Sequence, residues 1–255
     1  MTDETRLDGI VALVTGGGAG MGRAHALLMA ERGADVVVQD IDESPAAETA
    51  AQIRARGRRS AHFVFDISVV GAIDPMMAAV ERDFGGLDVL VNNAGIGGEN
   101  AVIEDIDERR FERMFNVHAK GTFFCGRGAM AMMKKRGRGK IINTATRWAL
   151  SGHETSSHYI CAKSAILGMT KAWAKELAPH NITVNAVAPG GVWTDMVLKA
   201  RGAAFIRAEE QKVPLKRWAQ PDEYAYLVAF LASRQSDFIT GQVISPNGGA
   251  TIVGF

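Results

Sequence analysis

Hydrophobic and polar residues follow two arrangements along the chain: short apolar runs, and longer stretches with helical periodicity. The apolar runs are rich in β-branched residues and predict strands. The predicted strands cover residues 10–14, 35–39, 61–65, 87–91, 140–144, 182–187 and 242–245. The periodic stretches predict helices over residues 21–32, 45–56, 69–84, 107–135, 157–177 and 222–233. The longest of these helices is expected to bend near Gly121.

The order of these elements, strand and helix in turn, predicts the fold class. Most strands are apolar on both faces, which is typical of a parallel sheet covered by helices on both sides. We therefore expect an α/β protein whose single domain spans residues 1–255, with about seven strands in one doubly wound sheet. Ligands of such sheets bind beyond the carboxyl ends of the strands, so we expect the chemistry in the loops there.

Composition and charge narrow the function classes. The 255 residues are 47% hydrophobic and 22% charged, as in an ordinary globular protein, and the formal net charge is +1. This charge gives no bulk attraction to nucleic acid or to an anionic membrane. No apolar run approaches the ~20 residues of a membrane span, and the polar N-terminus has no signal region. We expect a cytoplasmic protein without a metal, in which Cys125 and Cys161 are reduced core residues.

A glycine-rich turn follows the first predicted strand and opens the first helix. It reads Thr-Gly-Gly-Gly-Ala-Gly-Met-Gly over residues 15–22. Glycines let the backbone approach a phosphate closely, and a helix N-terminus offers free N–H groups, so this turn predicts a dinucleotide site. No Gly-Lys-Ser/Thr follows, which excludes a P-loop. The expected contacts are Gly16, Gly18, Gly20, Met21 and Gly22.

Asp40 ends the second predicted strand, roughly 20 residues beyond the glycines. A carboxylate here can accept hydrogen bonds from both adenosine ribose hydroxyls, and it would repel a 2′-phosphate. Neither Ala19 nor Ile41 supplies a cation to offset that repulsion, so the residues favour NAD over NADP, with Ile41 as a neighbouring contact. The alternative is that Asp40 only caps the following turn.

Two further strand ends carry polar or small residues. Asp66 ends the third strand and either faces the adenine or caps the N-terminus of a helix that begins at Ser68. After the fourth strand, residues 92–95 read Asn-Asn-Ala-Gly, which is small enough for a flat cofactor to lie against the backbone. The asparagines can equally bind neighbouring strand ends. The cofactor contacts expected here, beside Asp66, are Ile67, Asn93, Ala94 and Gly95.

Tyr159 and Lys163 lie four residues apart in the predicted helix 157–177. On a helix that spacing puts both side chains on one face, one turn apart. An ammonium beside a phenol favours the phenolate and lowers the tyrosine pKa, which makes the tyrosine usable as a general acid or base. The alternative is a surface tyrosine stacked on a lysine stem.

Together these motifs resemble the short-chain dehydrogenase/reductase family. The matching positions occur in order and cover almost the whole chain. They are residues 15–22, Asp66, residues 92–95, Asn116, Tyr159 with Lys163, and Pro189-Gly190 leading to Thr194. The resemblance implies a Rossmann-type fold, a nicotinamide cofactor, and hydride transfer to or from a carbonyl or alcohol carbon.

The resemblance also implies roles for single residues. Tyr159 is similar to the general acid/base, and Lys163 to the residue that lowers its pKa and binds the nicotinamide ribose. Asn116 resembles the asparagine that holds a water in the proton path; a polar kink in the long helix is the other interpretation, and the two are compatible. A further segment resembles the one that holds the nicotinamide amide in the family. It contains Pro189, Gly190, Val192 and Thr194.

The chain departs from the family pattern at two places. The family usually has a serine thirteen residues before the tyrosine, where this chain has Thr146. Threonine keeps the hydroxyl and adds a methyl, so we expect Thr146 to act as the donor. The alternative donors are Ser151, Ser156 and Ser157. The second departure is Ser-Pro-Asn-Gly-Gly at 245–249, which we expect to alter a turn near a subunit contact.

The residues expected to line the substrate pocket are largely apolar or aromatic. They are Trp148, His153, Trp193 and Met196. Such walls suit a hydrophobic or ring-bearing secondary alcohol or ketone. Arg147 either pairs with a substrate carboxylate or stays solvated. Residues 194–216 are less regular and long for a plain connection, so they predict a lid that orders on binding.

Two helical stretches, residues 123–135 and the helix that carries Tyr159, would expose apolar faces on a monomer. They resemble the helices through which family members form tetramers, so we expect a homotetramer, with burial inside the subunit as the alternative. The expected function is NAD-dependent hydride transfer to or from a secondary alcohol or ketone. The alternative is a redox sensor that holds NAD without turnover, which only the departure at Thr146 favours.

Overall fold

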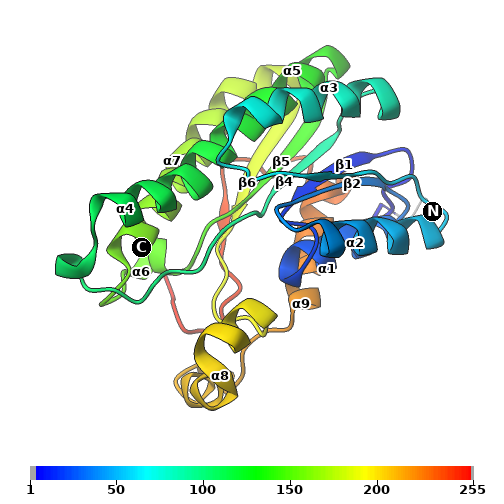
Figure 1. Ribbon diagram of the computed structural model, residues 1–255. Coiled ribbons are helices and arrows are strands. Elements are labelled where there is room, and N and C mark those ends of the chain that lie inside the picture. Colours follow the sequence, from blue (N-terminus) through cyan, green and yellow to red (C-terminus); the bar gives the residue numbers. More distant parts are fainter. Residues whose placement is uncertain (1–3, 254–255) are drawn as a thin grey trace.

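Seven parallel strands form one sheet in the order β3-β2-β1-β4-β5-β6-β7, in a computed structural model that describes residues 4–253 (Figure 1). The strands are β1 (Val11–Thr15), β2 (Asp35–Asp40), β3 (His62–Val64), β4 (Val89–Asn92), β5 (Gly139–Thr144), β6 (Ile182–Val187) and β7 (Val243–Ile244). The chain runs outward from β1 to β3 and then returns to β4 beside β1. This order confirms the doubly wound sheet and puts its switch point between β1 and β4.

Helices cover both faces of the sheet (Figure 1). On one face α1 packs against α2 and α9, and on the other α3 packs against α5 and α4 against α7. Among residues 4–253, no helix is long and apolar enough to cross a membrane. The bounds are α1 (Gly20–Glu31), α2 (Glu43–Ala55), α3 (Ile73–Phe84), α4 (Glu108–Phe115), α5 (Gly121–Arg136), α6 (Trp148–Ser151), α7 (Ser157–Leu177), α8 (Asp195–Glu210) and α9 (Pro221–Ala232). Shorter 3-10 turns are η1 (Val70–Ala72), η2 (Ile103–Asp105), η4 (Ala178–His180) and η5 (Arg234–Ser236).

Each face of the sheet has its own hydrophobic core, because successive strand residues point to opposite sides. Leu13 of β1 lies in one core with Met133 of α5 and Trp173 of α7. The next residue, Val14, lies in the other core with Met29 of α1. Every residue of β1 is buried, which is what the unbroken apolar run predicts.

The predicted helix 107–135 is interrupted by one turn of π-helix, η3 (Asn116–Lys120), between α4 and α5. The π-turn ends at the residue before Gly121, so the helix is irregular where a bend was expected. Gly121 allows a close approach, since a Cβ atom there would lie 3.0 Å from Ile67 Cγ2. The wider turn also shifts the side chains of 116–120 out of the register of α4.

Residues 194–216 are more regular than their sequence predicts, because α8 occupies most of them. α8 bends at Gly202, whose φ of 77° and ψ of 160° are not helical. Thr194 caps the first turn by accepting a hydrogen bond from Val197 N–H at 3.4 Å. The break at Gly202 interrupts the helical period, which is why the segment looks irregular from sequence alone.

The two cysteines occupy different environments, and the expectation for one of them is wrong. Cys125 of α5 is buried, as predicted for a core residue. Cys161 of α7 is exposed, because its position on the helix points away from the sheet. Apolar neighbours in sequence do not tell which face of a long helix a residue occupies.

Candidate active site

Side chains at the carboxyl ends of β1 and β4 tie the two loops of the switch point together. Thr15 Oγ1 accepts hydrogen bonds from the N–H groups of Asn93 and Ala94, both at 3.0 Å. Asn93 Nδ2 donates in return to the carbonyl oxygens of Thr15 at 3.1 Å and Gly16 at 3.3 Å. Asn93 thus bonds a neighbouring strand end, which is the structural alternative, and holds the glycine loop against the loop after β4.

Asn92 begins a second polar network, inside the sheet. Its Nδ2 donates to Asn143 Oδ1 of β5 at 2.9 Å, and Asn143 Nδ2 donates to Thr170 Oγ1 of α7 at 3.0 Å. All three side chains are buried, so each bond satisfies groups that would otherwise be costly to bury. The network fixes α7 relative to β4 and β5.

The space around the glycine loop explains its composition. Gly16 and Gly20 have φ values of 62° and 52°, a region that favours glycine. A Cβ atom at Gly18 would lie 2.8 Å from Asp40 Oδ2, and one at Gly22 would overlap the carbonyl group of Gly16. α1 begins at Gly20 without a side-chain cap, so its first N–H groups stay available to a phosphate. The loop is therefore a cradle that only glycines can form.

Asp40, at the end of β2, lies over this cradle. Its Oδ2 accepts a hydrogen bond from Gly18 N–H at 2.8 Å, and its Oδ1 accepts one from Ile41 N–H at 2.7 Å. The carboxylate thus caps its own turn and also places a negative charge beside the glycines. Arg23 of α1 is paired with Glu48 of α2. The cradle and the carboxylate fit the phosphates and ribose of a dinucleotide.

Asp66 and Ile67 follow β3. Asp66 Oδ1 accepts a hydrogen bond from Ser68 N–H at 2.8 Å, so Asp66 caps a turn, whereas the next helical segment, η1, begins only at Val70. The Ile67 side chain is buried in the core against Gly121. Only the backbone of Ile67 is therefore available to a cofactor.

Tyr159 and Lys163 lie one turn apart on α7, near the end of β5. Lys163 Nζ donates to Thr144 O at 2.7 Å and lies 6.0 Å from the centroid of the Tyr159 ring. Burial lowers the pKa of Lys163 to about 7. Burial also raises the pKa of Tyr159 to about 12, although a hydrogen bond with the Thr146 side chain lowers it. Protein atoms alone thus favour a neutral phenol, because desolvation outweighs the hydrogen bond with Thr146.

Thr146, which follows β5, is the hydroxyl residue beside this phenol. Its side chain is buried and hydrogen-bonds Tyr159. Two alternative donors are engaged or placed elsewhere: Ser151 is exposed, and Ser156 Oγ accepts a hydrogen bond from Asn100 N–H at 3.0 Å. Thr146 therefore lies beside the phenol, and its role as the donor stays a prediction.

The π-turn brings His118, two residues after Asn116, against Tyr159. The two rings meet edge to face with their centroids 5.3 Å apart. Within the described residues, no hydrogen bond joins the Asn116 side chain to Tyr159 or Lys163, so its role stays a prediction. Sequence reasoning missed His118, although a lone polar side chain between Val117 and Ala119 was a usable signal.

Trp148 and His153 form an aromatic wall beside Tyr159. Their rings stack with centroids 4.0 Å apart, and Trp148 meets the Tyr159 ring edge to face at 6.1 Å. Trp148 begins α6, a short helix that the sequence did not predict. In the part of the chain that is described, the buried Trp148 Nε1 has no hydrogen-bond partner. This N–H group is a free donor close to the phenol.

The start of α8 lies between the glycine loop and the loop after β4. Thr194 Cγ2 lies 3.4 Å from the place that a Cβ atom would take on Gly20, and Met196 Sδ lies 3.8 Å from the corresponding place on Gly97. Met196 is 54% exposed. Trp193 Nε1 donates to Glu210 Oε1 at 2.8 Å, at the far end of α8. Met196 is thus free to cover a ligand, whereas Trp193 secures the helix.

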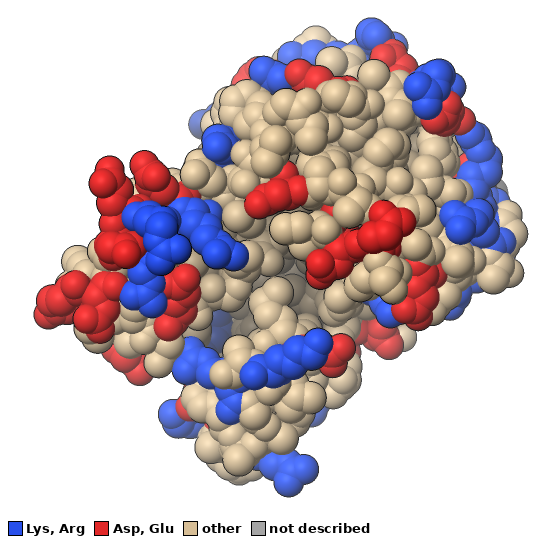
Figure 2. All heavy atoms as spheres, in the orientation of Figure 1, with Lys and Arg blue, Asp and Glu red and all other residues tan. Residues whose placement is uncertain are grey.

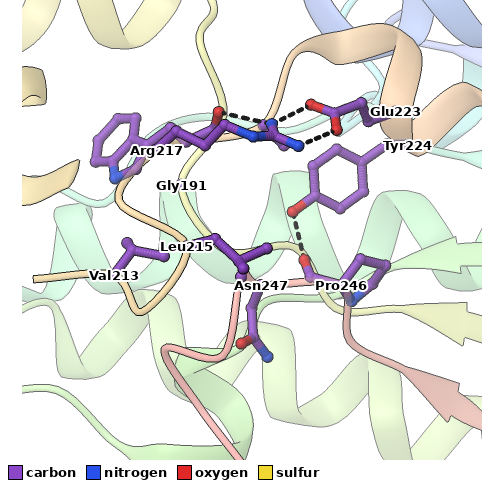
Figure 3. A pocket seen from close by; sticks show the side chains of 11 residues that line it. Gly191, Val213, Leu215, Arg217, Glu223, Tyr224, Pro246 and Asn247 are labelled. Carbon is purple, nitrogen blue, oxygen red and sulfur yellow. Dashed lines mark hydrogen bonds and ion pairs between the residues drawn. The ribbon is translucent and has the colours of Figure 1, made fainter. Parts of the chain in front are cut away.

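Tyr224 of α9 joins the segment 189–192 to the C-terminal segment, and Figure 3 shows its bond to Pro246. Tyr224 Oη accepts a hydrogen bond from Gly190 N–H at 3.0 Å and donates one to Pro246 O at 2.5 Å. A cavity of about 160 Å³ lies next to this anchor, lined by α9, residues 213–219 and the C-terminal segment. The hydrogen bonds leave the Pro189 loop little freedom relative to β7.

The molecule is hollowed between α8 and the body of the sheet, as Figure 2 shows. Lys and Arg side chains gather on the visible side of α8, whereas the walls of the hollow are mostly uncharged (Figure 2). Such walls suit a ligand with apolar surface.

Comparison with known proteins decides the family. The family described as enoyl-(acyl carrier protein) reductase matches residues 16–251. The 3-oxoacyl-[acyl-carrier-protein] reductase FabG of Thermotoga maritima is 36% identical over 251 residues, which cover 97% of this chain and 100% of that protein. The chain belongs to the short-chain dehydrogenase/reductase family. Short-chain dehydrogenases/reductases are oxidoreductases that use nicotinamide cofactors, and the cradle, Asp40 and Lys163 fit such a cofactor.

Other members of the short-chain dehydrogenase/reductase family differ in substrate and cofactor. The cis-4-hydroxycyclohexanecarboxylate dehydrogenase of Sinomonas cyclohexanicum is 36% identical over 244 residues, covering 95% of this chain and 97% of that protein. Among solved structures, an NAD+-bound xylitol dehydrogenase aligns with a TM-score of 0.90 at 30% identity, covering 95% of this chain and 99% of that one. An L-sorbose reductase of Gluconobacter frateurii, complexed with NADPH and L-sorbose, aligns with a TM-score of 0.93 at 27% identity, covering 98% and 100%.

Proposed function

We propose that this short-chain dehydrogenase/reductase transfers a hydride between NAD(H) and the carbinol or carbonyl carbon of a hydrophobic or cyclic secondary alcohol or ketone. The observation that carries the proposal is the meeting of Tyr159, Thr146 and Lys163 at the carboxyl end of β5. A phenol beside a fixed hydroxyl and an ammonium is the set of groups that proton transfer to or from an alcohol requires.

In the oxidation direction, the substrate hydroxyl lies between Tyr159 and Thr146. Tyr159 Oη, as the phenolate, takes the hydroxyl proton, and the Thr146 hydroxyl donates to the oxygen as negative charge develops on it. NAD, when bound, supplies the hydride acceptor and a positive ring whose charge favours the phenolate. Lys163, held by Thr144 O, keeps a second positive charge on the same side of the phenol. In reduction the same groups work in reverse.

The preference for NAD over NADP rests on the surroundings of Asp40. Its carboxylate already faces Gly18 N–H at 2.8 Å, so a 2′-phosphate would have to approach a negative charge. Ile41 offers no compensating cation, and Arg23 is neutralised by Glu48. Ribose hydroxyls, in contrast, donate to this carboxylate.

The substrate class is supported by the walls around Tyr159. Trp148 and His153 present stacked rings, and Met196 of α8 adds an exposed, flexible apolar side chain near Gly97. The likeness to a dehydrogenase of a hydroxycyclohexane carboxylate supports a ring-bearing secondary alcohol. Arg147 Nη1 donates to Thr251 Oγ1 at 3.3 Å, so a substrate carboxylate would compete with Thr251 for this guanidinium.

Assembly, lid and location belong to the same proposal. We infer a cytoplasmic homotetramer built through α5 and α7; on α5, Phe123 is 43% exposed. Met132 and Met133 are buried in the subunit, so only part of the Met-rich stretch is available for contact. The proposed single domain covers residues 1–255, of which residues 1–3 and 254–255 lie outside the described residues. We also propose that α8 forms the lid over the substrate.

A panel of secondary alcohols and ketones, assayed with NAD and NADP side by side, tests the proposed function through the absorbance of the reduced nicotinamide. We expect turnover with NAD and a hydrophobic or cyclic substrate. Tyr159→Phe should lose turnover while it still binds NAD. Full activity of this variant would show that Tyr159 is not the general acid or base. Tight NAD binding by the wild-type protein without turnover of any substrate would favour a redox sensor.

A further inference from the structure

Ser156 begins the helix that carries Tyr159, and it does so in an unusual conformation. It is the N-cap residue of α7, and Tyr159 is the third residue of that helix. An N-cap serine ordinarily has an extended backbone, and its hydroxyl accepts a hydrogen bond from the N–H of the second or third helical residue. Here φ is 63° and ψ is 36°, in the left-handed region, and α7 has no side-chain cap. The hydroxyl that ordinarily binds the N–H of residue 159 is therefore engaged elsewhere.

The partner of this hydroxyl is the loop after β4, in residues 98–101. Ser156 Oγ accepts a hydrogen bond from Asn100 N–H at 3.0 Å, and Ser156 N–H donates to Ala101 O at 2.8 Å. Thr155 Oγ1 donates to Asn100 Oδ1 at 2.9 Å. Asn100 also has a left-handed backbone, with a φ of 54°. These three hydrogen bonds form a clasp that joins the loop to the start of α7.

The clasp holds the loop beside the reacting phenol. A Cβ atom at Gly98 would lie 3.1 Å from Ser156 Oγ and 3.4 Å from Tyr159 Cγ. The backbone of the loop therefore packs on Ser156 and next to the Tyr159 ring, with little room for a side chain between them. Because the loop lies against the ring, its position helps to set the orientation of the phenol.

The clasped arrangement costs free energy at three places. A left-handed backbone is disfavoured for serine, although asparagine tolerates it. The first turn of α7 gives up its cap. His158 is 1% exposed, and within residues 4–253 neither of its ring nitrogens has a hydrogen-bond partner, although Glu99 Oε2 of the loop lies 3.9 Å from Nε2. Costs of this kind gather at functional sites and at segments that have a second conformation.

Space for a second conformation lies beside the clasp. A cavity of about 240 Å³ separates residues 101–104 from residues 153–157, which are the segments that the clasp joins. The loop can therefore move without displacing the core. When the Ser156 backbone is extended, its hydroxyl faces Tyr159 N–H, as in an ordinary N-cap.

We propose that Ser156 is a positioning residue with two alternative partners. Bound to Asn100 N–H, it closes the loop on the Tyr159 ring and fixes the phenol for reaction. Bound to Tyr159 N–H, it caps α7 and releases the loop, which widens the hollow beside the phenol. This inference rests on the proposed function, because it gives Tyr159 its orientation for proton transfer.

Two substitutions at residue 100 separate these states. Asn100→Gly and Asn100→Pro both remove the side-chain bond to Thr155. Glycine keeps the N–H group and accepts a left-handed backbone, whereas proline has no N–H and fixes φ at about −65°. Asn100→Pro thus frees the Ser156 hydroxyl for Tyr159 N–H, and Asn100→Gly is its matched comparison. Asn100 is exposed, so neither variant disturbs the core.

Amide hydrogen exchange of the free protein, resolved by 15N NMR, reports both partners of Ser156. In Asn100→Pro, Ser156 N–H should exchange at least about tenfold faster, because its bond to Ala101 O opens. Tyr159 N–H should exchange at least about tenfold more slowly, because it gains the hydroxyl. Adding Ser156→Ala to Asn100→Pro should abolish this slowing. Faster exchange of both amides in the proline variant, or no change in either, would overturn the proposal, since a loosened loop cannot protect Tyr159 N–H.

Turnover shows whether the clasp positions the phenol. Asn100→Pro should lower kcat by about tenfold with an unchanged Kd for NAD, because a reacting group that is displaced loses rate. Asn100→Gly, which keeps the clasp, should lose much less. Equal kcat values for the two variants would show that the clasp does not position Tyr159.

The exchange measurement needs no substrate, so it keeps this inference separate from the proposed function. Opposite changes at the two amides in a protein that turns over no alcohol would reject the proposed function and leave the two partners of Ser156 established. Turnover of an alcohol without those opposite changes would keep the proposed function and reject the role of Ser156.

Discussion

Lys163 Nζ donates to the carbonyl oxygen of Thr144 across 2.7 Å, which ties the ammonium of α7 to the last residue of β5. One hydrogen bond replaces only part of the hydration that the ammonium loses, so burial brings the lysine pKa down to about 7. The same desolvation that makes the lysine a proton donor near neutral pH therefore makes the stability of the fold depend on pH.

The stability of the protein should rise between about pH 7 and pH 10 because of Lys163. Its pKa is about 7 in the folded state against 10.5 ordinarily, so the unfolded state binds more protons in this window and rising pH favours folding. The free energy of unfolding in urea, at pH 7 and pH 9, should increase by about 2 kcal/mol more in the wild type than in Lys163→Met. Equal increases in both proteins would assign the effect to another group. Above pH 10 the sign reverses for Tyr159, whose pKa is raised to about 12.

Thr146 should be replaceable by serine and not by alanine. Thr146→Ser keeps the hydroxyl beside Tyr159 and should retain most of the turnover. Thr146→Ala removes a donor to the developing oxyanion and should lower kcat by about 10²–10³-fold. It also removes the bond that lowers the Tyr159 pKa, so the rise of kcat with pH should move to higher pH. An alanine variant with wild-type kcat would mean that Thr146 only packs.

Asp40 should control the choice between NAD and NADP. Asp40→Ser with Ile41→Arg replaces a negative charge by a positive one at the edge of the glycine cradle. The ratio of the two Kd values should shift towards NADP by at least about tenfold, or about 1.4 kcal/mol. Asp42→Ser, which changes an exposed carboxylate two residues away, is the control and should leave the ratio unchanged. If the double variant still prefers NAD, residues outside the end of β2 determine the choice between NAD and NADP.

A methyl group at Gly18 should damage the cradle. Its Cβ atom would lie 2.8 Å from Asp40 Oδ2 and 2.9 Å from Pro45 Cβ, and the backbone of α2 leaves no room to yield. Gly18→Ala should lower the free energy of unfolding by about 1–3 kcal/mol and weaken NAD binding. Gly71→Ala serves as the comparison, because nothing lies within 4 Å of its Cβ position. Thermal unfolding and NAD titration of the two variants measure these losses. Equal losses in both variants would contradict the steric argument.

The bend of α8 should be sensitive to a single methyl group. Gly202 has a φ of 77°, and no atom lies within 4 Å of its Cβ position, so Gly202→Ala acts on the backbone alone. The strain of about 1–3 kcal/mol should straighten α8 or loosen it. We expect the KM for the alcohol to rise more than the Kd for NAD, since Met196 stands on the first half of this helix. If KM stays constant, α8 does not close over the substrate.

The parts of the fold that follow from local pattern could be predicted, and those that depend on distant contacts could not. Strand β1 is an apolar run because both of its faces are buried, and Tyr159 and Lys163 share a face because four residues make about one helical turn. The contact of His118 with Tyr159 arises from a π-turn, whose extra residue has no marker in the hydrophobic period. Burial decides the pKa values of the site, and it depends on packing that sequence spacing does not contain.

The alternatives that the sequence alone left open also divide into those decided by local contacts and those decided by distant ones. Asp66 proved to cap a turn at Ser68, which adjacent residues already indicated. Asn93 proved to bond Thr15, which lies seventy-eight residues earlier and is a neighbour only because the sheet is doubly wound. The helix over 195–210 escaped prediction because one glycine interrupts it.

The hydrogen-bonded series Asn92, Asn143 and Thr170 separates the protein into a rigid half and an adaptable half. It pins α7 from within the sheet, so the helix that carries Tyr159 is held by groups other than those that face the substrate. Those side chains sit on α6 and α8, outside that series. Substitutions at Met196 should therefore add independently to changes in the reacting groups, whereas those at Trp148, whose ring meets that of Tyr159 at 6.1 Å, should be coupled to them.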